Sequence, residues 1–136
     1  HFVNFVRSSG EYDKKHKAHI AVITSVAGTR GLGSAPAYSA SKAMQSEYIT
    51  ALSQLCSMES IPAKFTDIRP GFVKTAILNP EKHYPMLISA QSAAQHIYRG
   101  IKHKRRVLIF DWRFKLLVGL WHLIPRFVWE RLKVRN

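Results

Sequence analysis

Short apolar runs alternate with longer helical patterns through most of this sequence. Three runs rich in β-branched residues predict strands at residues 19–25, 63–68 and 106–110. The first run is bounded by charge before it and glycine after it, which is typical of a buried parallel strand. Residues 37–58 and 90–102 repeat apolar side chains at helical spacing, and Ser89 is a typical N-cap for the second of these helices. Strands that alternate with helices predict an α/β fold in which helices cover a parallel sheet.

Three stretches fall outside this pattern. Residues 2–15 begin apolar and then become polar, which predicts the last turns of a helix, and the chain starts at His1 without an initiating Met. We therefore expect the sequence to be the C-terminal part of a longer chain. Residues 72–88 contain two prolines and are expected to be irregular. The chain thus divides into a body at residues 1–110 and a basic, tryptophan-rich helical tail at residues 111–136.

The composition excludes several classes of protein. The single cysteine, Cys56, cannot form an internal disulfide or a cysteine-based metal cage, and we expect it to be a buried thiol on the long helix. The histidines are scattered without acidic partners at ligand spacing, so no metal site is expected. The sequence shows no secretory signal and no apolar run of the roughly 18 residues that a membrane span needs.

Positive charge is concentrated toward the C-terminus. The whole chain has a formal net charge of +13, and residues 102–136 hold ten Lys or Arg against two acids, a net of +8. Pro125 can begin a second helix there. An apolar helical stripe is expected at Leu117, Leu120, Trp121, Ile124 and Val128. Tryptophans among basic residues suit an anionic membrane surface, whereas the alternative is packing on the protein's own sheet or on a subunit partner. Nucleic acid is not expected as a partner.

Tyr38 and Lys42 lie four residues apart on the long predicted helix, so their side chains share one face about one turn apart. A free tyrosine is a poor acid or base near neutrality, and a neighbouring ammonium favours its phenolate form. Ser25, at the end of the first strand, could hydrogen-bond a substrate oxygen and hold it near the phenol. These three groups together would polarise a carbonyl while a cofactor delivers hydride. The alternatives are an ordinary amphipathic helix pair, a strand-end cap at Ser25, and a competing role for Thr24.

Three short segments follow one another in the order that this chemistry needs. They are Ile23-Thr24-Ser25-Val26-Ala27-Gly28, Tyr38-Ser39-Ala40-Ser41-Lys42 and Arg69-Pro70-Gly71-Phe72-Val73-Lys74-Thr75. The tyrosine stands thirteen residues after the serine. In this order and spacing the sequence resembles the short-chain dehydrogenases/reductases over roughly residues 1–110. The resemblance implies the C-terminal part of a doubly wound, Rossmann-like parallel sheet.

The resemblance also implies an NAD(P)-dependent oxidoreductase that interconverts a hydroxyl and a carbonyl group on a small-molecule substrate. Tyr38 would be the acid/base, Lys42 would favour the phenolate and hold the nicotinamide ribose, and Ser25 would orient the substrate. Tyr38 and Lys42 would both contact the cofactor, NAD or NADP. The residues expected to lie against the nicotinamide are Pro70, Gly71, Val73 and Thr75, although Thr75 could instead cap a short helix. A homo-oligomer and a cytoplasmic location are implied as well, with the tail permitting peripheral membrane attachment.

One part of the family pattern is missing from this sequence. The phosphate-binding glycine turn belongs to the family's first strand-helix unit, whereas Gly28, Gly31 and Gly33 precede Tyr38, and Pro36 stands where a third glycine would be. We therefore expect the chain to be the second half of the enzyme, and the 136 residues alone are not expected to turn over. The alternative is a binding or scaffold protein that kept the fold and docks through its basic tail.

Overall fold

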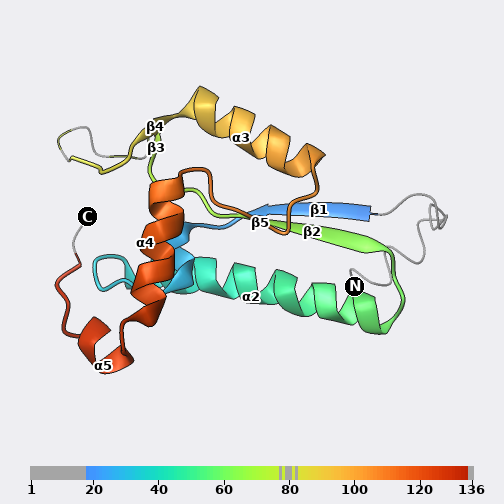
Figure 1. The fold of residues 1–136 in the computed structure, drawn as a ribbon, viewed down its shortest axis with the longest axis horizontal. Coiled ribbons are helices and arrows are strands. Elements are labelled where there is room, and N and C mark those ends of the chain that lie inside the picture. Colours follow the sequence, from blue (N-terminus) through green and yellow to red (C-terminus); the bar gives the residue numbers. More distant parts are fainter. Residues whose placement is uncertain (1–17, 77, 79–80, 82, 135–136) are drawn as a thin grey trace.

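A computed structural model describes residues 18–76, 78, 81 and 83–134 of the chain. The helix predicted within residues 2–15 lies outside the described residues. A three-stranded parallel sheet in the order β1-β2-β5 forms the centre of the fold. Its strands are β1 (Ala18–Ile23), β2 (Ala63–Ile68) and β5 (Val107–Leu108). Helices lie on both sides of this sheet (Figure 1), which confirms the predicted α/β fold.

Two helices cover the sheet, α2 (Pro36–Met58) on one side and α3 (Ala90–Lys102) on the other (Figure 1). α3 has the bounds that the sequence predicts, because Ser89 caps it by accepting a hydrogen bond from the Ser92 amide at 3.1 Å. α2 begins with a proline, whose missing amide proton suits the first turn of a helix. Between α2 and β2 lies a core of Ile49, Cys56, Ile61 and Phe65. Cys56 is buried as predicted, and burial raises the pKa of its thiol.

The strands differ from the prediction in burial and in length. β2 lies between the other two strands, and its last four side chains are buried. β1 was expected to be buried, but it is an edge strand of the described sheet, and its side chains are half-buried or exposed. It also ends at Ile23 rather than at Ser25. β5 is paired only at Val107 and Leu108, because the chain turns away from β2 after these residues.

The segment between β2 and α3 is more ordered than the sequence suggests. The prediction of an irregular stretch over residues 72–88 is wrong at its two ends, where β3 (Val73–Lys74) and β4 (Ile88–Ser89) pair in parallel. The Ile88 amide also donates to the Phe72 carbonyl at 3.1 Å. This pairing closes the segment into a loop at the carboxyl end of the main sheet (Figure 1).

The tail forms two helices, α4 (Trp112–Leu123) and α5 (Arg126–Trp129), which are separated at Pro125 as predicted. The predicted apolar stripe is correct at Trp121, which is buried, and wrong at Leu117 and Leu120. The buried side chains of α4 are Phe114, Val118 and Trp121, whereas Leu117 and Leu120 are exposed. Apolar side chains occupy both sides of α4, so the sequence pattern does not fix which side turns inward. Among the described residues, no helix combines the length and apolar character needed to cross a membrane.

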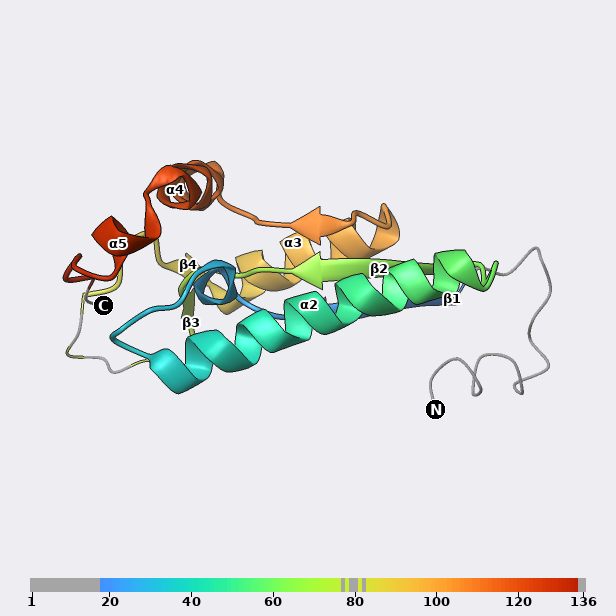
Figure 2. The same cartoon turned by 90° about the horizontal axis from the view of Figure 1, so that it is seen from below.

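α4 lies beyond the carboxyl ends of the strands and contacts the segment that follows β1 (Figures 1 and 2). Its buried side chains share a core with Val26, which follows β1. Phe72, which follows β2, packs against the same core. The tail therefore covers part of the sheet edge at which the predicted site lies.

Candidate active site

The loops that follow β1 and β2 are bound to each other. The Thr24 amide donates to the Ile68 carbonyl at 2.7 Å, and the Val26 amide donates to the Pro70 carbonyl at 3.0 Å. The short helix η1 (Val26–Thr29) then begins directly after Ser25. Parallel strands bring their carboxyl ends to one edge, where ligands of open α/β sheets bind. The structure thus brings the predicted serine and the Pro70-Gly71 turn side by side.

Ser25 is buried, and its hydroxyl oxygen is fixed by one strong contact. The Ala27 amide donates to Ser25 Oγ at 3.1 Å, so the serine does cap η1. Its own proton points to the Pro70 carbonyl at 3.5 Å, which is at the long limit for a hydrogen bond. The accepted bond holds Oγ in place, while the weak donated bond leaves the proton able to turn to another acceptor.

The hydroxyl of Thr24 lies in a different environment from that of Ser25. It is buried and has acceptors in Asp67 Oδ1 at 2.5 Å and the Ile68 carbonyl at 3.1 Å. A hydroxyl has one proton to donate. Because these interior acceptors engage that proton, the geometry favours Ser25 over Thr24 as the donor to a substrate.

Lys42 connects α2 to the end of β1. Its ammonium donates to the Ile23 carbonyl at 3.1 Å and to Gln45 Oε1 at 3.2 Å. The same Nζ lies 5.9 Å from the centre of the Tyr38 ring, one helical turn away. The Tyr38 side chain is 49% exposed, and the described residues provide no hydrogen-bond partner for its phenolic oxygen. Tyr38 and Lys42 are thus together at the edge where Ser25 lies, although no hydrogen bond joins the tyrosine and serine hydroxyls.

Close backbone contact between η1 and α2 sets the spacing of these groups. A Cβ atom at Gly28 would lie 2.7 Å from the Lys42 carbonyl carbon and 2.8 Å from the Ala43 amide nitrogen. Side chains essentially never approach backbone so closely, and only glycine fits there. The start of α2 is held further by Ser39 Oγ, which accepts from the Leu32 amide and donates to the Pro36 carbonyl, both at 3.1 Å.

The residues predicted to face a nicotinamide differ in their surroundings, because Gly71 contacts the tail whereas Val73 and Thr75 lie in β3 and the turn after it. The Phe114 ring of α4 lies directly against Gly71, where a Cβ would come within 2.1 Å of it. Val73 is half-buried in β3, and Thr75 is exposed in the turn that follows. The Thr75 carbonyl accepts from the Leu78 amide at 3.2 Å, and the described residues that follow Thr75 are assigned to no helix before α3.

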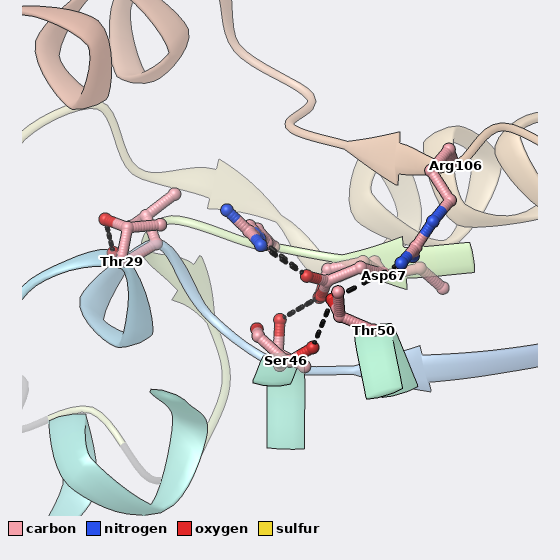
Figure 3. A network of polar contacts seen from close by, with 9 residues as sticks. Thr29, Ser46, Thr50, Asp67 and Arg106 are labelled. Carbon is pink, nitrogen blue, oxygen red and sulfur yellow. Dashed lines mark hydrogen bonds and ion pairs between the residues drawn. The ribbon is translucent and has the colours of Figure 1, made fainter. Parts of the chain in front are cut away.

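A group of polar contacts that includes the buried Asp67 was not predicted from the sequence (Figure 3). Asp67 is 1% exposed, accepts from Thr24, and forms an ion pair with Arg69 at 2.6 Å. Nearby, Thr50 Oγ1 donates to the Ser46 carbonyl at 2.9 Å. Arg106 Nη2 then donates to the same hydroxyl at 3.3 Å, which links α2 to the start of β5. A carboxylate within an apolar strand pattern is the one signal in the sequence that could have indicated this network.

A hollow in the described surface lies away from these groups. It is open, has a volume of about 390 Å³, and is lined by Ile88, His96, Phe110, Asp111, Trp112 and Arg113. Arg113 hydrogen-bonds Asp111 and holds the pKa of that carboxyl below its usual range. None of the predicted site residues lines this hollow.

Comparisons with known proteins identify the family. The family model for short chain dehydrogenases matches residues 2–85. An uncharacterized oxidoreductase of Myxococcus xanthus is 29% identical over 114 residues, which cover 82% of this chain and 44% of that protein. An uncharacterized oxidoreductase of Mycobacterium tuberculosis is 24% identical, over 85% of this chain and 46% of that protein. The chain therefore spans slightly less than half the length of these relatives.

Solved structures agree on the fold. A short chain dehydrogenase of Burkholderia cenocepacia in complex with NADP superimposes with a TM-score of 0.67 at 16% identity, over 98% of this chain and 55% of that one. The apo form of LigD from a Sphingobium strain superimposes with a TM-score of 0.58 at 17% identity, over 88% of this chain and 44% of that one. The chain belongs to the short-chain dehydrogenase family, and the described part has the Rossmann-like architecture of that family.

Proposed function

We propose that the protein to which this chain belongs is an NAD(P)-dependent oxidoreductase that interconverts a hydroxyl and a carbonyl group. The observation that carries the proposal is the position of three side chains at one sheet edge. Ser25 follows β1, Lys42 is bound to the last carbonyl of that strand at 3.1 Å, and Tyr38 lies one turn before Lys42. The oxidoreductase relatives and the NADP complex of a structural neighbour support the same assignment.

The donors of these residues suit a nicotinamide nucleotide. An ammonium has three donors, and two of those on Lys42 are used by Ile23 and Gln45, so one remains for a ribose hydroxyl. Pro70 lies beside Ser25 and would offer a surface for the nicotinamide ring, with Val73 and Thr75 further along, whereas Gly71 is in contact with the Phe114 ring. The bound cofactor supplies the hydride donor or acceptor, which no side chain of this chain can replace.

The side chains then handle the substrate oxygen and its proton. Ser25 donates its weakly held proton to that oxygen and fixes the oxygen near the phenol. Tyr38 gives its proton to the oxygen when a carbonyl is reduced, and takes it back when an alcohol is oxidised. The positive charge of Lys42, one turn away, favours the Tyr38 phenolate that forms when a carbonyl is reduced. The ammonium and the serine hydroxyl together stabilise negative charge where it develops.

The test compares two tyrosines of the same helix in the full-length protein. Tyr38→Phe removes the phenol at the site, whereas Tyr48→Phe removes an exposed phenol further along α2. We expect Tyr38→Phe to bind NADH and NADPH as the unaltered protein does and to lose turnover by at least about a hundredfold. Tyr48→Phe should retain both. Binding is measured by nicotinamide fluorescence, and turnover by nicotinamide absorbance with a panel of alcohols and ketones.

Two outcomes would contradict the proposal. The first is the absence of nicotinamide binding in the unaltered full-length protein, which would favour a non-catalytic role for the fold. The second is equal turnover in the two phenylalanine variants, which would remove Tyr38 from the chemistry.

A further inference from the structure

α4 exposes a row of large apolar side chains on the side opposite its buried face. Trp112, Leu116, Leu120 and Leu123 follow one another at helical spacing and therefore share that side. Trp112 is 72% exposed and Leu123 79%, so these side chains have no cover in the described structure. Phe127 of α5 and Leu132 are exposed as well. We name the surface formed by Trp112, Leu116, Leu120 and Leu123 the tail face. A single exposed leucine is ordinary, whereas a contiguous row indicates a binding surface.

The orientation of the tail face is fixed by contacts on the other side of α4. Arg30 reaches from the loop before α2 and donates to the Ile124 carbonyl at 2.7 Å and to the Trp121 carbonyl. Its guanidinium lies 4.6 Å from the centre of the Trp129 ring, and Trp129 Nε1 donates to the Gly31 carbonyl at 2.8 Å. Because these contacts hold both tail helices against the body, α4 cannot simply rotate to bury its exposed row.

The segment that carries the tail face is basic. Residues 111–134 carry five Lys or Arg against two acids, a net of +3, and the five basic side chains are exposed. Arg113 pairs with Asp111 and Arg126 with Glu130. Lys115, Arg131 and Lys133 therefore carry the excess charge of this segment.

We propose that the tail face binds the surface of an anionic phospholipid membrane. An exposed apolar row with an interfacial tryptophan and basic neighbours matches both layers of such a surface, the acyl boundary and the charged headgroups. A second copy that met this chain through the same face would bring two charges of +3 together, which disfavours that pairing. Nucleic acid would use the basic side chains but leave the leucines without a partner.

The first experiment separates the charge of the tail face from the charge of the whole protein. Full-length protein is sedimented with vesicles of phosphatidylcholine alone or mixed with phosphatidylglycerol. The test variant is Lys115→Gln/Arg131→Gln/Lys133→Gln. Its control, Lys102→Gln/Lys104→Gln/Arg105→Gln, removes the same charge at the far end of α3. At low salt each lost cation weakens binding about fivefold, so we expect roughly a hundredfold loss in the test variant.

The second experiment tests the apolar row. Leu116→Gln/Leu120→Gln/Leu123→Gln should lose most of the vesicle binding with its charge unchanged, whereas Tyr98→Gln, which removes an exposed ring from α3, should retain it. Trp112 should shift its fluorescence to shorter wavelength when mixed vesicles are added, because its exposed ring leaves water. Trp112→Phe should remove that shift and leave most of the binding.

The proposal predicts binding to mixed vesicles that salt reverses, together with unequal effects of the two charge variants. Three results would overturn it. They are no binding of the full-length protein to mixed vesicles, equal loss in the two charge variants, and dissociation of an oligomer by the leucine variant without any change in vesicle binding. The last result would assign the tail face to a second copy. Nicotinamide binding, measured on the same variants, distinguishes these outcomes from a loss of the fold.

Discussion

Gly28→Ala is expected to disturb the candidate site through backbone geometry alone. The new Cβ would lie 2.7 Å from the Lys42 carbonyl carbon, whereas ordinary contact begins at 3.4 Å, so η1 and α2 must separate by about 0.7 Å. The neighbouring atoms belong to the backbone of a helix of 23 residues and cannot turn aside as a flexible side chain would. The separation moves Lys42 away from Ser25.

The expected cost is about 2 kcal/mol in the free energy of unfolding, within the usual range for overpacking. A cost of that size lowers the Tm of a domain of about 200 residues by roughly 4–8 °C. Misplacement of a catalytic group by about 1 Å costs up to a hundredfold in rate, so kcat/KM of the full-length protein should fall by roughly 10- to 100-fold. Thermal unfolding and steady-state turnover measure the two effects separately.

Gly33→Ala is the matched control, because a Cβ there would meet no atom within 4 Å. Gly33 lies between η1 and α2. The Gly33→Ala variant should therefore show at most a small stabilisation, because alanine reduces the conformational entropy of the unfolded chain. Equal Tm and kcat/KM in the two alanine variants would show that the contact between η1 and α2 does not set the geometry of the site.

Three further predictions concern the site and the sheet. Lys42→Ala should weaken both nicotinamide affinity and turnover, the latter by roughly a hundredfold, and unchanged affinity would contradict its role toward the ribose. Asp67→Ala leaves Arg69 without its buried counter-charge, and should cost about 3–5 kcal/mol in urea unfolding. The exposed acid Glu47 is its control, and an equally small effect of Glu47→Ala and Asp67→Ala would refute the argument. Burial, with two nearby lysines, lowers the pKa of His19 below 6.5, so the unfolded state binds its proton more readily. The stability of the full-length protein should therefore fall as pH drops through about 6.5, and His19→Gln should remove that part of the fall. An identical pH profile in the variant would exclude this cause.

The sequence by itself determined the features that depend on a few neighbouring residues. The Ser89 cap and the apolar period set both ends of α3, and Pro125 separates the two tail helices because it cannot continue the first. The spacing of Ser25, Tyr38 and Lys42 indicated a site, since strand ends and first helical turns meet at one edge of a parallel sheet. Each of these features depends on a few residues that are close in sequence, so local backbone preferences are sufficient to determine it.

Tertiary structure decided what depends on contacts between distant residues. α4 is apolar on both sides, and Arg30, which binds the Ile124 carbonyl across 94 positions in the sequence, holds one of those sides against the body. Thr24, which follows β1 and donates to Asp67, is 43 positions away from it, so the burial of Asp67 could not be predicted from its own strand. Whether β1 is an edge strand depends on which strands pair with it. The buried side of a helix and the position of a strand in a sheet depend on the free energy of the whole packed structure. A short segment of sequence does not determine that free energy.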